Sequence, residues 1–303
     1  MNVFDQAARF AAKLDAIGFL RWLLARLDTD LTFARWLDTQ TIPFPGEADR
    51  RCDTVAEIVH VAGLAPPWAA VIEFQTRPDA DMPYRLLEYL GRLGRELRHG
   101  PHGRDRYLLA AVVVNLTGTG ETVSLEMVLP GQTGVELRLK PCVLNLSEVS
   151  AVETLAGIAA GTIARCILAW VPLMAGGGAA ENLAEWKRLA SPETNRRLRA
   201  EYGGLALQFA ELAGCREVWE KLLEDWNMEE SQVVAGWIAR GERKAVRSKL
   251  IETLEVRFPG PLPTELLATL QAENDIDRLS RWFKIALTCP SVEQFQETIK
   301  VGE

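Results

Sequence analysis

The sequence predicts a mixed α/β fold in its first half and an all-α second half. Polar and apolar residues alternate over residues 50–61, as in a half-buried strand, and an apolar, partly β-branched strand follows at 69–75. Residues 107–116 form a nearly continuous apolar run, typical of a strand that is buried on both faces. From residue 148 onward the apolar spacing is helical. This order predicts a mixed sheet flanked by helices, followed by a helical region.

The amino-terminal segment, residues 4–37, is expected to form two helices. Its apolar residues recur near helical spacing with charges between them, which is typical of helices that face a core. Residues 40–49 contain two prolines and a glycine and are expected to form a loop.

The first two strands are expected to form a hairpin that brings two carboxylates together. Residues 63–68, with Pro66 and Pro67, are typical of a connection between neighbouring strands. Asp53 on the first strand and Glu73 on the second are then expected to lie side by side. Two residues farther on, Gln75 faces the same side of the sheet as Glu73.

Paired carboxylates at a strand end form a hard oxygen site. With a backbone carbonyl, that of Phe74, directed to the same place, Asp53 and Glu73 would suit Mg²⁺ or Mn²⁺. These residues are the metal ligands that the sequence predicts.

The helix expected over residues 82–98 has an apolar stripe and a charged face. The charged face carries Arg85, Tyr89 and Arg92, and two readings of it stay open. It is either a solvated surface with ion pairs four residues apart, or Arg85 and Tyr89 line the site and hold a phosphate. The strand at 107–116 follows by a helical crossover, and two further strands are expected at 122–129 and 135–146.

The segment from Glu73 to Tyr89 resembles a known family. The pattern of Asp53 followed by Glu73-Phe74-Gln75, an acidic turn at Asp79, and a helix that opens with Tyr84-Arg85 is similar to the PD-(D/E)XK nuclease superfamily. In particular it resembles the recombination-promoting nuclease (Rpn) branch, which is also described as transposase-like. Residues 4–5, 19–24, 254–263 and 291–295 are similar to the terminal segments of such proteins.

The resemblance implies a restriction-endonuclease-like core and a function. The chain would be a magnesium-dependent DNA endonuclease that hydrolyses phosphodiester bonds in recombination or in mobile elements. Its catalytic residues would be Asp53, Glu73 and Gln75. A carboxylate on the first helix, Asp5, is either a further acid or a helix-start residue that stabilises the helix dipole. Phosphate or DNA contacts would come from Arg77, Arg85, Tyr89 and Arg92.

Gln75 departs from the superfamily pattern, which usually has lysine there. Glutamine orients water by hydrogen bonding but adds no positive charge. An alternative function is therefore a catalytically weakened nuclease fold that serves as a binding or assembly module.

The predicted domains are a nuclease-like domain at 1–147 and a helical region at 148–303 with a small tail bundle from about residue 243. Glycine clusters divide the helical region, with helices expected at 152–173, 229–238 and 242–258, among others. The helical region is interpreted as a lid, a dimerisation surface giving a homodimer, or a module that presents the target.

Composition limits the partners. The net charge of −7 argues against broad wrapping of nucleic acid, so DNA binding requires a local basic patch. Such a patch is expected from the arginines between residues 50 and 106. Five scattered cysteines indicate neither a disulfide framework nor a zinc site and fit a reducing, cytoplasmic location. The sequence predicts no signal peptide and no membrane segment.

Overall fold

The computed structural model describes residues 3–26, 31–37, 54–63, 66–99, 107–120, 124–128 and 136–301. Two compact units divide the chain, Met1–Ser231 and Gln232–Glu303. The helices that follow residue 148 therefore belong partly to the first unit and partly to the second.

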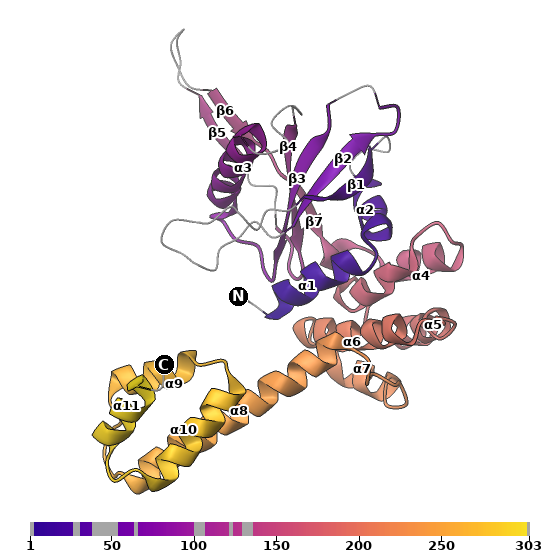
Figure 1. The fold of residues 1–303 in the computed structure, drawn as a ribbon. Coiled ribbons are helices and arrows are strands. Elements are labelled where there is room, and N and C mark those ends of the chain that lie inside the picture. Colours follow the sequence, from indigo (N-terminus) through magenta and orange to yellow (C-terminus); the bar gives the residue numbers. More distant parts are fainter. Residues whose placement is uncertain are drawn as a thin grey trace. The chain divides into compact units, whose positions relative to one another are not determined.

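A five-stranded mixed sheet is the centre of the first unit (Figure 1). Its strands, in spatial order, are β1 (Leu31–Leu37), β2 (Val55–His60), β3 (Trp68–Gln75), β4 (Leu108–Asn115) and β7 (Cys142–Asn145). The pairs β1–β2 and β2–β3 are antiparallel, whereas β3, β4 and β7 run parallel to one another. The predicted α/β class with a mixed sheet flanked by helices is confirmed, as are the β2–β3 hairpin and the parallel crossover to β4.

The first strand corrects the prediction that residues 4–37 are helical throughout. Helices α1 (Val3–Leu14) and α2 (Ala16–Leu24) form as expected, but β1 follows them and pairs with β2. Phe33, Trp36 and Leu37 have a spacing that also fits a helix. Pairing with β2 decides the conformation, and the aromatic residues suit a strand.

Residues 135–146 also differ from the single strand that was expected. Pro141 separates β6 (Glu136–Leu139) from β7, because proline has no N–H to donate within a sheet. β6 pairs with β5 (Leu125–Val128) in a separate two-stranded sheet, while β7 joins the main sheet beside β4.

Helix α3 (Met82–His99) covers one face of the sheet. Alternate residues of β3 and β4 point toward it, and with the helix they form a buried apolar cluster whose members include Val71, Val113, Met82, Leu86 and Leu93. The face of the helix is set by its apolar spacing, as predicted for 82–98.

The opposite face of the sheet packs on aromatic rings. Phe74 of β3 lies 6.1 Å from Phe19 of α2 and 5.7 Å from Trp170, measured between ring centroids. Trp170 belongs to a 3₁₀ segment, η2 (Arg165–Leu173), and stacks in turn on Phe209 of α6 (Arg196–Leu212). These rings join the sheet to the helices that follow it.

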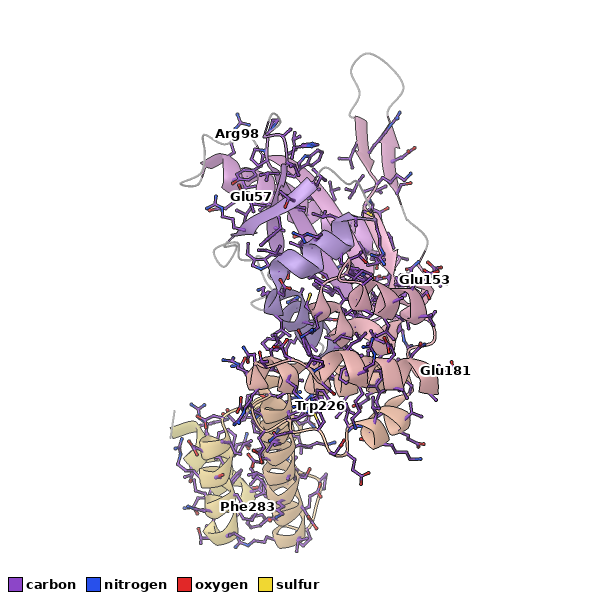
Figure 2. All side chains as sticks on the ribbon, turned by 90° about the vertical axis from the view of Figure 1, so that its right-hand side faces the viewer. Glu57, Arg98, Glu153, Glu181, Trp226 and Phe283 are labelled. Carbon is purple, nitrogen blue, oxygen red and sulfur yellow. The ribbon has the colours of Figure 1, made fainter. Side chains whose placement is uncertain are left out.

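The helix expected over residues 152–173 is interrupted. It consists of α4 (Ala151–Ala159) and the 3₁₀ segment η2, with Gly161 between them at φ +73°, a left-handed conformation that commonly ends helices. Helices α5 (Ala180–Ala190) and α7 (Arg216–Leu222) complete this part. Trp226, labelled in Figure 2, contacts the ring of Trp186 and donates to the carbonyl of Arg199.

The second unit is a helical bundle with its own core. It contains α8 (Gln232–Arg257), α9 (Thr264–Ala272), α10 (Ile276–Thr288) and α11 (Val292–Val301). Gly241 does not break α8, although two helices were expected there. Phe283, labelled in Figure 2, packs against a buried cluster that includes Leu250, Leu266 and Trp282. Of the helices that the structure describes, none is long and apolar enough to cross a membrane.

Candidate functional site

Two polar side chains are buried at the carboxyl end of β3. Glu73 and Gln75 are each 7% exposed, and both point toward α3, as alternation along a strand requires. Phe74, between them, points to the opposite face. Ligand sites in parallel α/β sheets commonly lie at the carboxyl ends of the strands, which is where these residues are placed.

Arg85 connects this strand end to α3. Its guanidinium donates to Oε1 of Glu73 at 3.0 Å and to Oδ2 of Asp79 at 3.1 Å. Burial alone would lower the pKa of Arg85, but hydrogen bonds to Tyr89 and Asp79 and the charge of Glu73 outweigh it and raise the pKa. Arg85 is therefore a fixed positive charge beside Glu73.

Asp5 of α1 approaches from the other side of the same strand end. Thr76, the residue after β3, donates from its hydroxyl to Oδ1 of Asp5 at 3.1 Å. Burial raises the pKa of Asp5, and the hydrogen bond from Thr76 with the charges of Arg9 and Arg85 offsets part of that rise. The Asp5 carboxylate is thus close enough to Arg85 for the guanidinium charge to lower its pKa.

The predicted ligand Asp53 lies outside the described residues. Its neighbour Thr54 is described, and the Thr54 carbonyl accepts from the N–H of Ile72. Because backbone groups alternate between the two neighbouring strands, the carbonyl of Phe74 is also directed toward the β2 side. In the described part of the chain, no group of three or more His, Cys, Asp or Glu side chains could hold a metal ion.

The donors nevertheless have the chemistry that a hard cation requires. Glu73 supplies carboxylate oxygens and Phe74 a carbonyl oxygen, and Asp53 would supply a second carboxylate. Arg85 already engages Oε1 of Glu73, so a cation at this position has to compete with the guanidinium.

The predicted phosphate-binding residues are not all brought together. Arg85 lies at the site together with Tyr89, whose side chain hydrogen-bonds to Arg85 while its ring is 5% exposed within the apolar cluster under α3. Arg92 pairs with Glu88 one helical turn away, at 2.7 Å. Arg77 is exposed in the turn after β3. Arg98, labelled in Figure 2, is exposed farther along the same helix.

Two asparagines that the sequence analysis missed extend the site across the sheet. Asn115 ends β4 in register with Gln75, and Asn145 ends β7 in register with Asn115. Asn145 accepts from the N–H of Gly120 and donates to the Gly120 carbonyl, both at 3.1 Å, and its Oδ1 also accepts from Nδ2 of Asn115 at 2.8 Å. A polar residue closing each apolar strand was the signal that could have identified them.

A pocket of about 310 Å³ opens beside these side chains. Gln75, Asn115, Asp79 and Thr119 contribute polar groups, and the remaining wall is mostly apolar, with Pro78, Met82 and Val143 among its members. Gly120 has no room for a side chain there, because a Cβ atom would lie 2.7 Å from Nδ2 of Asn115.

The geometry defines an α/β protein with a charged and amide-rich site at the carboxyl edge of a mixed sheet. No family model, curated protein or solved structure matches the chain. The resemblance to PD-(D/E)XK nucleases therefore remains a prediction from the sequence.

Proposed function

We propose that the chain is a metal-dependent endonuclease that hydrolyses phosphodiester bonds in DNA. The observation that carries the proposal is the burial of Glu73 and Gln75 on one face at the end of β3, with Arg85 bound to Glu73. Asp5 adds a carboxylate from α1 near the same strand end. An association with recombination or mobile elements rests on the resemblance to the Rpn branch alone.

Each residue of the proposed site would have a separate role in cleavage. Asp53, Glu73 and the carbonyl of Phe74 would hold Mg²⁺ or Mn²⁺, which would polarise the phosphate and lower the pKa of a bound water. The side-chain oxygen of Gln75 accepts a hydrogen bond and so can orient the attacking water. The guanidinium of Arg85 matches a phosphate in shape and charge, so it can transfer from Glu73 to the substrate.

A second function is favoured by the ion pairs around Arg85. Glu73 and Asp79 both share this guanidinium, as expected if their charges were structural, and Gln75 adds no positive charge. The chain would then bind DNA or assemble on it without cleaving it.

Nicking of supercoiled plasmid by the purified chain, with Mg²⁺, Mn²⁺ or a chelator, tests the proposal. Cleavage that requires metal and disappears in Asp53→Ala and in Glu73→Gln is expected. Glu185→Gln is the matched control, because Glu185 is a carboxylate on α5 that pairs only with Arg188 among the described residues, and this variant should cleave normally.

The same preparations also test the second function. Anisotropy of labelled DNA in chelator measures binding without cleavage. If the folded wild type binds DNA saturably but cleaves it with neither Mg²⁺ nor Mn²⁺, the nuclease proposal is overturned and the non-catalytic module is supported. Unchanged cleavage by Glu73→Gln would show that Glu73 is not part of the active site.

A further inference from the structure

Two buried amides at the pocket have unused hydrogen-bonding groups. Within the described part of the chain, Nε2 of Gln75 and Oδ1 of Asn115 have no hydrogen-bond partner, although Asn115 is only 2% exposed. Buried polar atoms are normally satisfied by protein, water or a ligand. Both side chains line the same pocket, and although the two atoms themselves are covered, a turn of each side chain would let one occupant satisfy both.

The backbone of Gly120 fixes which end of Asn115 is unused. Asn145 must turn its oxygen to the N–H of Gly120 and its nitrogen to the Gly120 carbonyl, because the reverse would place like groups together. Asn115 must then donate its own nitrogen to Asn145, which leaves its oxygen as the unpartnered acceptor beside the pocket. The acceptor character of this position is therefore set by main-chain groups.

We propose that this pocket binds a single nucleobase. An occupant must offer an acceptor to Nε2 of Gln75 and a donor to Oδ1 of Asn115. Each base has such a neighbouring pair on its hydrogen-bonding edge, for example N1 and the amino group of adenine. A phosphate or carboxylate would place an acceptor against Oδ1, so an anion fits poorly. A cation would be attracted by the Asp79 carboxylate in the lining but would oppose the amide N–H of Gln75.

The walls and the size of the pocket also suit a base. Pro78, Met82 and Pro83 supply apolar surface on one side, and Val113 and Val143 supply it on the sheet. Mostly apolar walls with a few placed polar groups are typical of small-molecule sites, and about 310 Å³ is at the lower end of their size range. The pocket thus suits one ring system rather than a larger ligand.

The pocket lies beside the proposed cleavage site, and this position bears on which substrate the chain would prefer. Gln75 is two residues from Glu73 on the same face of β3, so a bound base would lie beside the proposed cleavage site. A base that enters such a pocket has to leave its stack and its pair. Other ligands also carry an adjacent donor and acceptor, so the choice of a nucleobase rests on the proposed function. The preferred substrate would be DNA with an unpaired base.

Titration of the full chain with each of the four deoxynucleosides, followed by calorimetry or ligand-observed NMR in chelator, tests the inference. Deoxyribose, which lacks a base, is the negative probe. Saturable binding of at least one nucleoside, and none of deoxyribose, is expected. Gln75→Met removes the donor at similar volume and should weaken binding by about tenfold.

A second variant keeps the test independent of the amides. Ala80→Phe places a ring at the rim of the pocket and should abolish binding. Ala62→Phe, at an exposed turn between β2 and β3, is the matched control and should bind normally. Absence of saturable binding, equal binding of deoxyribose, or binding unchanged in Ala80→Phe would overturn the pocket. Because the chelator removes metal-dependent cleavage, failure here is separate from failure of the nuclease proposal.

Discussion

Arg85 on α3 holds the carboxylate of Glu73 on β3 through a 3.0 Å hydrogen bond. The Glu73 side chain is 8% exposed and that of Arg85 32%, so the carboxylate is the partner that depends more on the pair. Removal of the guanidinium would leave a buried charge with less compensation, which costs more than an exposed pair contributes. Several consequences of this pairing can be measured.

Arg85→Ala should lower the free energy of unfolding by about 1–3 kcal/mol, less than for a fully buried pair because Arg85 is partly exposed. Urea denaturation measures the change. Arg216→Ala is the control, since its pairs with Glu211 and Glu220 are exposed, and its cost should stay below about 1 kcal/mol. Adding Glu73→Gln to Arg85→Ala should recover part of the loss. Equal losses in both arginine variants would show that the Glu73 pair is no stronger than a surface pair.

Magnesium should stabilise Arg85→Ala more than it stabilises the wild type. If Asp53 and Glu73 hold the cation, the guanidinium competes with it, and its removal raises the affinity for Mg²⁺. At a concentration tenfold above the Kd the gain would be about 1.4 kcal/mol. Thermal unfolding with increasing Mg²⁺ provides the measurement. The gain should vanish when Asp53→Asn is added, and an identical magnesium response in wild type and Arg85→Ala would contradict competition.

Asp5 should make the chain less stable as the pH rises from the acidic range. Burial raises its pKa in the folded state above the ordinary 3.8, so the folded state keeps a proton that the unfolded state has lost. Its contribution is complete below pH 3.8 and is lost as the pH rises through the folded-state pKa. Asp5→Asn keeps an acceptor for Thr76 and removes the ionisation. The variant should match the wild type at the acidic limit and exceed it in stability at pH 7. Denaturation of both proteins across this pH range is the measurement. A stability difference between them that does not change with pH would show that ionisation of Asp5 is not the cause.

Much of the strand arrangement around the site could be predicted from local patterns. The apolar run into Glu73, the prolines at 66 and 67, and the helical spacing after Met82 each reflect short-range chemistry, and they give the β2–β3 hairpin and α3. Spacing by two also places Glu73 and Gln75 on one face, because side chains alternate along a strand.

The parts that could not be predicted depend on contacts between distant residues. Residues 31–37 become a strand because β2 is beside them, and their own spacing does not distinguish strand from helix. The Tyr89 ring joins the core because α3 buries it with Leu86 and Leu93, whereas its helical spacing with Arg85 and Arg92 had placed it on the charged face. Asn115 and Asn145 meet only because β4 and β7 are adjacent and in register, although 30 residues separate them.

Gln75→Lys should raise metal-dependent cleavage if the chain is a weakened PD-(D/E)XK nuclease. Lysine adds the positive charge that stabilises the developing negative charge on the phosphate, and a single preorganised donor of this kind can be worth about a hundredfold in rate. Since Gln75 is 7% exposed, the buried ammonium will also cost stability, so the fold has to be checked by circular dichroism. Gln75→Met, without charge or hydrogen bonding, should cleave more slowly than the wild type. A folded Gln75→Lys that is no faster than Gln75→Met would show that position 75 does not act on the reacting phosphate.

Asn145→Ala should destabilise the chain and also empty the proposed base pocket of its acceptor. The substitution leaves Nδ2 of Asn115 and both main-chain groups of Gly120 without their partner, which should cost about 1–3 kcal/mol. Nothing then fixes the oxygen of Asn115 as the free acceptor beside the pocket, so nucleoside binding should weaken even where the variant is fully folded. Asn227→Ala, which removes one exposed hydrogen bond to the N–H of Glu229 in the same unit, should change stability by less than about 0.5 kcal/mol and leave binding intact. Urea denaturation and nucleoside titration of both variants separate the two effects. Loss of stability with unchanged nucleoside affinity would mean that Asn145 supports the sheet edge without setting the orientation of Asn115.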